Sequence, residues 1–166
     1  MQKIEFSFRP LTPKTLHRPC IAVKFRNNNR EDKLLCIVDS GADFTTIPIQ
    51  AGFMLGINFN KSLAPEKIIE EWRNLNQSDN KQLNDFIKKI TEKKFAVPIN
   101  IGCACGKGTN GFLYSVEVEI GNHKKNLPIF WINADINPLL GRTGFFDKAK
   151  EVVFNARQNK GHFLME

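Results

Sequence analysis

The sequence of 166 residues lacks the features that define several large classes of protein. It has no apolar run near the length of about 18 residues that a transmembrane helix needs. Its first ten residues, MQKIEFSFRP, lack the continuous apolar stretch of a signal peptide. Four cysteines are too few for a disulfide scaffold in a chain of this length. These absences predict a cytoplasmic protein with no membrane partner.

Other scarcities concern aromatic residues and charge. One tyrosine and two tryptophans stand against 14 phenylalanines, and the net charge is +7. The basic residues are scattered and no nucleic-acid motif accompanies them, so they predict a solvated basic surface and no nucleic-acid partner. Hydrophobic residues make up 42% and charged residues 25%, which is typical of a folded chain. The length predicts one domain over residues 1–166.

The cysteines do not predict a metal site. Cys20 and Cys36 stand among apolar residues and are expected to be small buried hydrophobes. Cys103 and Cys105 form a C-x-C pair, but zinc would need a second pair or nearby histidines, and the three histidines are dispersed. We therefore expect neither metal nor cofactor.

Hydrophobic patterns predict a mainly β chain. Alternation predicts half-buried strands at residues 4–9, 21–26 and 114–120. The continuous apolar run at 34–38 predicts a strand buried on both faces, and the polar residues 26–32 predict a turn. Further elements are expected as strands at 45–47, 95–101 and 126–133, a brief helix at 48–55, a helical turn within 143–150 and a hairpin of 152–155 with 162–165.

Residues 65–92 differ from the rest because their apolar residues follow a helical period. One predicted helix starts at Pro65 and carries Trp72 on its apolar face, and a second, capped by Ser78 or Asp79, carries Phe86. This segment is too short for a domain, so we expect a helical insertion in a β fold. It would be a lid, a substrate-selecting wall or a docking surface, or would simply pack its apolar faces on the strands.

The strongest local signal is the run IVDSGAD at residues 37–43. An apolar strand ends at Asp39, and the chain then turns through Ser40 and Gly41. Asp, Ser and Gly are common turn residues, so a plain surface turn is one interpretation. A carboxylate held at the edge of the apolar core, fit for chemistry, is the other, and these residues alone favour neither.

A second segment, PLLGRTGFFD, begins at Pro138, 99 residues after Asp39. With it the chain resembles the retropepsin-like aspartic proteases, in which a hydrophobic strand leads into an Asp-Thr/Ser-Gly-Ala loop and a hydrophobic-hydrophobic-Gly-Arg motif follows. The sequence around His17, Arg18 and Pro19 is similar to the Arg-Pro-led first strand of retroviral members. The resemblance spans residues 17–57 and about 95–165, and implies a closed β barrel, here with a helical insertion at about 65–92.

The resemblance also implies how such a chain would act. Because only one Asp-Ser-Gly is present, the carboxylate pair would need a homodimer that brings together one Asp39 from each subunit. Two carboxylates at such a short distance share one proton. One of them activates a water and the other protonates the carbonyl oxygen of a peptide or protein substrate. This implies an aspartic endopeptidase without metal or covalent intermediate.

Site residues are carried over by position in the same resemblance. Asp39 is the implied catalytic residue, the Gly41 N–H would hold its carboxylate, and the Ser40 hydroxyl would bond across the dimer axis. Ala42 and Asp43 fall where the family binds substrate backbone. We expect Asp43 to form mainly a structural ion pair with Arg142, which Arg18 of the other subunit would join.

The glycine-rich residues 102–111 are expected to form a mobile flap over the bound peptide, or a plain flexible turn. The flap residues are Gly102, Cys103, Ala104, Cys105 and Gly106. Two other functions stay open at this point. One is a latent or non-catalytic dimeric peptide- or protein-binding module of the same fold; the other, less favoured, is a nucleic-acid-binding β protein that uses the basic surface.

Overall fold

The fold is that of a computed structural model, which describes residues 1–13, 15–102 and 108–166. Strands dominate it, as the hydrophobic alternation predicts. They are β1 (Gln2–Pro10), β2 (His17–Asn27), β3 (Arg30–Val38), β4 (Thr45–Pro48), β5 (Val97–Ile101), β6 (Thr109–Ile120), β7 (His123–Ile132), β8 (Leu139–Leu140), β9 (Ala149–Asn155) and β10 (Lys160–Met165). The helices are α1 (Ile49–Met54), α2 (Glu66–Asn74) and α3 (Asn80–Lys93), with short 3-10 turns η1 (Phe146–Lys148) and η2 (Ala156–Gln158).

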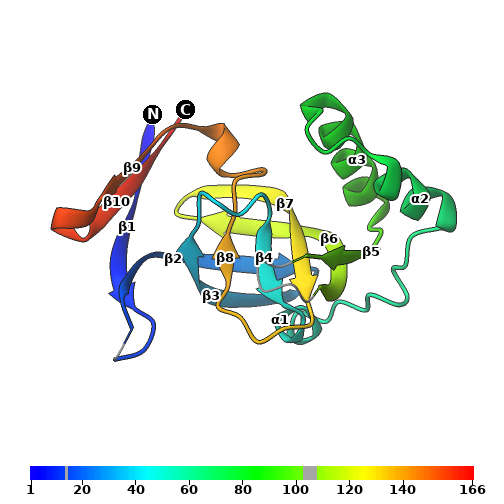
Figure 1. The fold of residues 1–166 in the computed structure, drawn as a ribbon, viewed down its shortest axis with the longest axis horizontal. Helices are drawn as coiled ribbons and strands as arrows, with labels where there is room; N and C mark the ends of the chain where they lie inside the picture. The colour runs from blue at the N-terminus through cyan, green and yellow to red at the C-terminus, as the bar shows by residue number, and fades with distance from the viewer. Residues whose placement is uncertain (14, 103–107) are drawn as a thin grey trace.

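The described strands form one sheet in the order β5-β6-β7-β4-β8-β3-β2-β1-β10-β9. An additional antiparallel pairing joins β6 to β2, so six strands are linked in a circuit in the order β6-β7-β4-β8-β3-β2 (Figure 1). Most neighbours are antiparallel, but β3–β8 and β4–β7 are parallel. The short strand β8 lies between β4 and β3 in the sheet, antiparallel to β4 and parallel to β3.

Both chain ends lie in a wing beside this circuit. β1 pairs with β10, which places Gln2 opposite Met165, and β10 pairs with β9 in the predicted hairpin. Figure 1 shows the two termini side by side at the upper left. Phe6 and Phe163 pack ring to ring in this wing, with centroids 5.2 Å apart.

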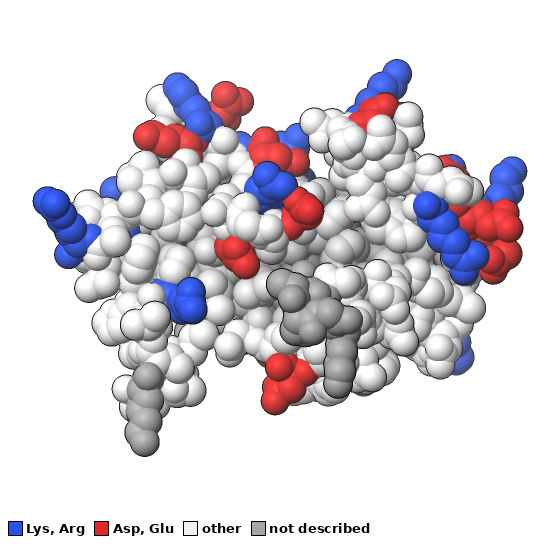
Figure 2. All heavy atoms as spheres, viewed as in Figure 1, with Lys and Arg blue, Asp and Glu red and all other residues white. Residues whose placement is uncertain are grey.

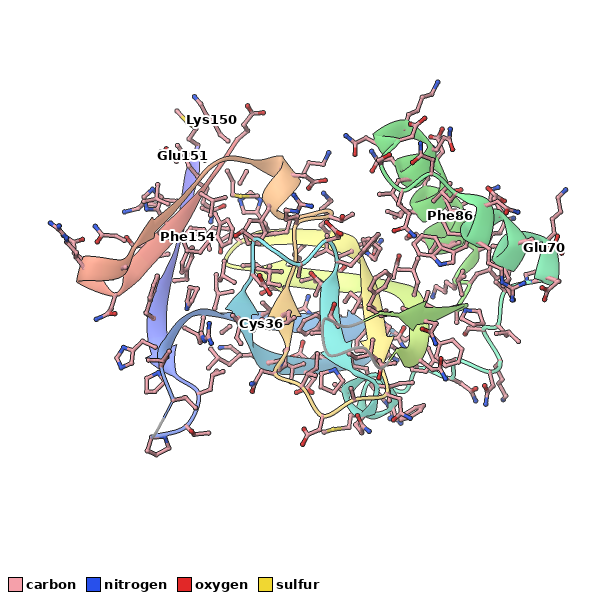
Figure 3. The ribbon with its side chains drawn as sticks, in the orientation of Figure 1. Cys36, Glu70, Phe86, Lys150, Glu151 and Phe154 are labelled. Atoms are coloured by element: carbon pink, nitrogen blue, oxygen red, sulfur yellow. The ribbon has the colours of Figure 1, made fainter. Side chains whose placement is uncertain are left out.

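The main core fills the interior of the six-stranded circuit. Val23, Phe25, Ile129 and Trp131 are all fully buried there, and the Trp131 indole N–H donates to the Tyr114 carbonyl. Cys20 and Cys36 are buried free thiols, as predicted, and burial raises the pKa of the Cys36 thiol. Figure 3 shows Cys36 in the middle of the sheet.

A second core lies between the sheet and the two helices α2 and α3. Asp79 caps α3 by accepting from the Lys81 and Gln82 backbone N–H groups, which selects it over Ser78. The apolar faces of the helices contact residues of β5, β6 and β7. This packing on the strands is one of the alternatives expected for the insertion. Phe86, labelled in Figure 3, is almost fully buried in this core.

Two expectations about the second and third strands are wrong. Residues 26–32 are mostly strand, because β2 and β3 stay paired as far as Asn27 and Arg30 and the turn needs only two asparagines. Asn28 adopts a φ of 53°, which asparagine tolerates better than most residues. The run 34–38 is not buried on both faces either, since Leu35 is 40% exposed while Cys36 beside it is buried.

Figure 2 shows acidic and basic side chains interspersed over one face of the molecule, without a broad patch of either sign among the described residues. Within those residues, no helix is long and apolar enough to cross a membrane.

Candidate active site

Asp39 follows β3 at the centre of the fold. Its backbone N–H donates to the Leu140 carbonyl at 3.0 Å, continuing the parallel pairing of β3 with β8. The Ile37 N–H donates in the same way to the Pro138 carbonyl at 2.8 Å. The two segments that the sequence singled out, 99 residues apart, are therefore hydrogen-bonded neighbours.

A tight turn holds the Asp39 carboxylate. The Gly41 N–H donates to its Oδ1 at 2.9 Å, as expected for this glycine, and the Ala42 N–H donates to the Asp39 carbonyl at 3.3 Å. A Cβ on Gly41 would lie 3.2 Å from the same Oδ1, so glycine gives the carboxylate room. Asp39 is half-buried and Ser40 is exposed. The carboxylate is thus fixed in direction yet open to solvent.

The chain after β8 braces the other side of this loop. The Arg142 N–H donates to the Ala42 carbonyl at 2.9 Å and the Thr143 N–H to the Asp43 carbonyl at 2.8 Å. The Gly141 N–H donates to the hydroxyl of Thr45, the only buried polar residue among those described. A Cβ on Gly141 would come within 2.3 Å of the Phe44 backbone, so the two segments can approach this closely only because residue 141 is glycine.

The Arg142 guanidinium donates to the Asp43 carboxylate, forming the ion pair that the sequence predicts. The side chains are 57% and 71% exposed, so solvent screens the pair and leaves it accessible. Arg18 forms no ion pair with a described residue of the same chain and lies instead on β2. Its predicted role in a partner subunit stays a prediction.

An open groove of about 600 Å³ lies beside Asp39. Its lining includes Arg18, Ser40 and the exposed apolar residues Leu16 and Phe154. A groove of similar volume, about 720 Å³, follows β1 and β10 but does not include the Asp39 loop. Of these two grooves, the one at Asp39 is lined by the loop that carries the carboxylate.

The predicted flap falls between β5 and β6, which are antiparallel arms with Ile101 opposite Thr109. Gly102 is exposed at the end of the first arm. The remaining flap residues, Cys103, Ala104, Cys105 and Gly106, lie outside the described residues. The described residues contain no cluster of His, Cys, Asp and Glu suited to hold a metal ion.

Sequence reasoning missed two residues that hold the site. Thr45 supplies a buried hydroxyl acceptor, and Phe44 packs beneath the loop against Phe130 with ring centroids 4.3 Å apart. The sequence predicted Thr45 only as part of a short strand, because its hydrogen-bond partner Gly141 lies 96 residues away in the chain. A phenylalanine directly after an acidic loop was the one available signal that this loop is anchored in a core.

Comparison with solved structures is informative about the fold. No protein-family model matches the chain, and no curated protein matches its sequence. Among solved structures, the chain is similar to the crystal structure of a retropepsin-like aspartic protease from Rickettsia conorii. The similarity has a TM-score of 0.56 and covers 98% of each chain at 13% sequence identity. The chain therefore has a mainly β fold like that of a retropepsin-like aspartic protease.

Proposed function

We propose that this protein is an aspartic endopeptidase with Asp39 as its catalytic residue. The observation that carries the proposal is the braced loop: Asp39 accepts from Gly41 and is tied through its backbone to Leu140. Such bracing fixes a solvent-open carboxylate in one direction, as acid–base catalysis requires. The fold similarity to a retropepsin-like aspartic protease supports the same chemistry.

The mechanism needs a second copy of the chain. One Asp39 cannot both take a proton from water and give one to the carbonyl oxygen in the same step. In the proposed homodimer the two Asp39 carboxylates share one proton, because like charges a few ångströms apart cannot both ionise. The ionised carboxylate takes a proton from the attacking water while its partner protonates the carbonyl oxygen of the scissile peptide bond.

The other residues of the loop take supporting roles in this proposal. Ser40, exposed beside Asp39, would bond across the two-fold axis, and Ala42 with Asp43 would hold substrate backbone. Arg18 of the partner would join the Asp43–Arg142 ion pair. The flap would close over the substrate, and the β2–β6 pairing would close the strands of each subunit into a barrel with α2 and α3 as its insertion.

A peptide-library digestion read by mass spectrometry tests the proposal. Wild type and Asp39→Asn are compared at micromolar concentration from mildly acid to neutral pH. Asparagine keeps the shape and the acceptor for the Gly41 N–H but cannot transfer the proton, so we expect cleavage by wild type alone. Cuts made by both proteins would contradict the proposal, and silence from both would favour the latent binding module.

A further inference from the structure

A second groove adjoins the active-site loop, and its helical side has no role in the functional proposal. It has a volume of about 750 Å³, within the range of sites for small ligands and peptide side chains. Asp43, Arg142 and Thr143 line one side, and residues 77–84 of the α2–α3 connection and α3 line the other. In Figure 1, η1 and α3 rise on either side of this region at the top of the view.

The helical side of the groove offers hydrogen bonds without charge. Gln77, Asn80 and Asn84 each bring a side-chain amide, and all three are exposed. Among the described residues, no hydrogen bond engages any of these three amides. An amide donates and accepts at once, so a row of them suits the peptide backbone or uncharged polar side chains.

The residues that one chain contributes to the opposite side are balanced in charge. Asp43 and Arg142 neutralise each other as an ion pair, and Asp147 and Lys148 add one charge of each sign. A charged ligand side chain would leave water here without gaining an unpaired counter-charge. Phe44 and Leu83, both buried, give the groove an apolar floor.

The two sides are held in fixed relation by a chain of aromatic contacts. Phe44, which directly follows Asp43, meets Trp72 of α2 at 6.3 Å between ring centroids, and Trp72 meets Phe86 of α3 at 5.5 Å. All three rings are buried. The amide row is therefore part of a rigid frame that includes the active-site loop, as a specificity site requires.

Distance along the chain places the groove within reach of a bound substrate. Four peptide units separate Asp39 from Asp43, which span at most about 14 Å. An extended peptide covers about 3.3 Å per residue. A substrate cut at Asp39 would therefore reach the groove within about four residues of the scissile bond.

We infer that this groove is a specificity site in which Asn80 and Asn84 select substrates with uncharged polar side chains, such as Asn, Gln, Ser and Thr, within about four residues of the cleaved bond. The inference rests on the proposed endopeptidase function and adds a substrate class to it. It also assigns α2 and α3 the task of a substrate-selecting wall.

The test compares wild type with the double variant Asn80→Ala/Asn84→Ala in the same peptide-library digestion. Both positions are exposed on a helix where alanine is well tolerated. The matched control is Lys81→Ala/Asp85→Ala, which changes two exposed positions of α3 at the same spacing and keeps the net charge. We expect the double variant to lose about tenfold in cleavage of peptides with the polar residues, as removing two neutral hydrogen bonds implies. The control should keep the wild-type profile.

An unchanged profile in the double variant, or an equal change in the control, would overturn the inference while leaving the endopeptidase proposal standing. A second measurement separates the two if wild type cleaves nothing. Fluorescence anisotropy then follows the binding of a labelled eight-residue Asn/Gln/Ser/Thr peptide to each protein, against a peptide carrying Lys and Glu. Tighter binding of the uncharged peptide, weakened about tenfold in the double variant alone, supports the groove; equal binding of the two peptides, or none, refutes it.

Discussion

Gly141 has no side chain, and this allows the chain after β8 to pack closely against the active-site loop. In Gly141→Ala the new methyl group would meet the Phe44 backbone at 2.3 Å, and backbone cannot move aside cheaply. We expect the free energy of unfolding to fall by about 2 kcal/mol or more. Urea denaturation followed by circular dichroism measures it.

Gly102→Ala is the matched control for this substitution, because no atom of the described residues lies within 4 Å of the added methyl group. Its free energy of unfolding should stay close to that of wild type. Equal losses in the two variants would mean that the Gly141 contact does not limit stability.

Thr45 provides a second test at the residue scale. Thr45→Val keeps the shape of the side chain but leaves the buried Gly141 N–H without its acceptor. The expected loss is about 1–3 kcal/mol of unfolding free energy, since an unsatisfied buried donor carries its full desolvation cost. Thr45→Ser keeps the hydroxyl and should lose less than Thr45→Val; the reverse order would refute the role of the hydrogen bond.

Among the elements, α2 and α3 depend on Trp72 for their attachment to the sheet. Trp72 is buried and lies between Phe44 and Phe86. Trp72→Ala should cost about 3–5 kcal/mol of unfolding free energy, as truncation of large buried aromatics does. Met54→Ala, at a 69% exposed position on α1, serves as the control and should change it by less than about 0.5 kcal/mol.

The β2–β6 pairing is fastened by a network of charges that predicts a pH dependence. Lys24 and Arg26 of β2 meet Glu119 of β6, and Lys124 joins them from β7. Burial raises the pKa of Glu119, but the hydrogen bond and charge of Lys24, with the charges of Arg26 and Lys124, lower it below its usual range. Folding therefore favours the ionised carboxylate, and this stability is present above the unfolded pKa of about 4.3 and is lost as the pH falls through the lowered pKa.

Urea midpoints of wild type and Glu119→Gln, measured from pH 7 to pH 2, check this dependence. Wild type should be the more stable protein at pH 7, and the difference should shrink below about pH 4. Glu151→Gln on the exposed face of β9 is the control and should follow wild type throughout. A difference between wild type and Glu119→Gln that does not change with pH would exclude the charge network as its cause.

The helices and strands show how much of the fold short-range sequence patterns can predict. Strands such as β6 and helices such as α3 were predictable because alternation, helical period and the Asp79 cap are short-range signals. The link between the Asp39 loop and the segment that contains Leu140 came from a family resemblance, since no local rule connects positions so far apart in the sequence. The exposure of Leu35 and the groove beside α3 depend on which neighbours tertiary packing supplies, and no local pattern contains that information.

For the whole molecule, the proposed dimer makes activity depend on protein concentration. Each active site would need two chains, so cleavage per chain should fall as the protein is diluted below its dimer dissociation constant. Sedimentation velocity and a peptide-cleavage assay over one dilution series would follow both quantities. Constant activity per chain in a range where sedimentation finds only monomer would rule out a shared Asp39 pair.

Phe44 joins the active-site loop to the second core, which has a consequence for how such a chain can diverge. Its backbone limits the space at Gly141, and its ring packs on Phe130 and Trp72. The helices α2 and α3 therefore cannot be replaced by another insertion without a change in the loop that holds Asp39. Any change in these helices, in evolution or by engineering, has to preserve the packing site of the Phe44 ring.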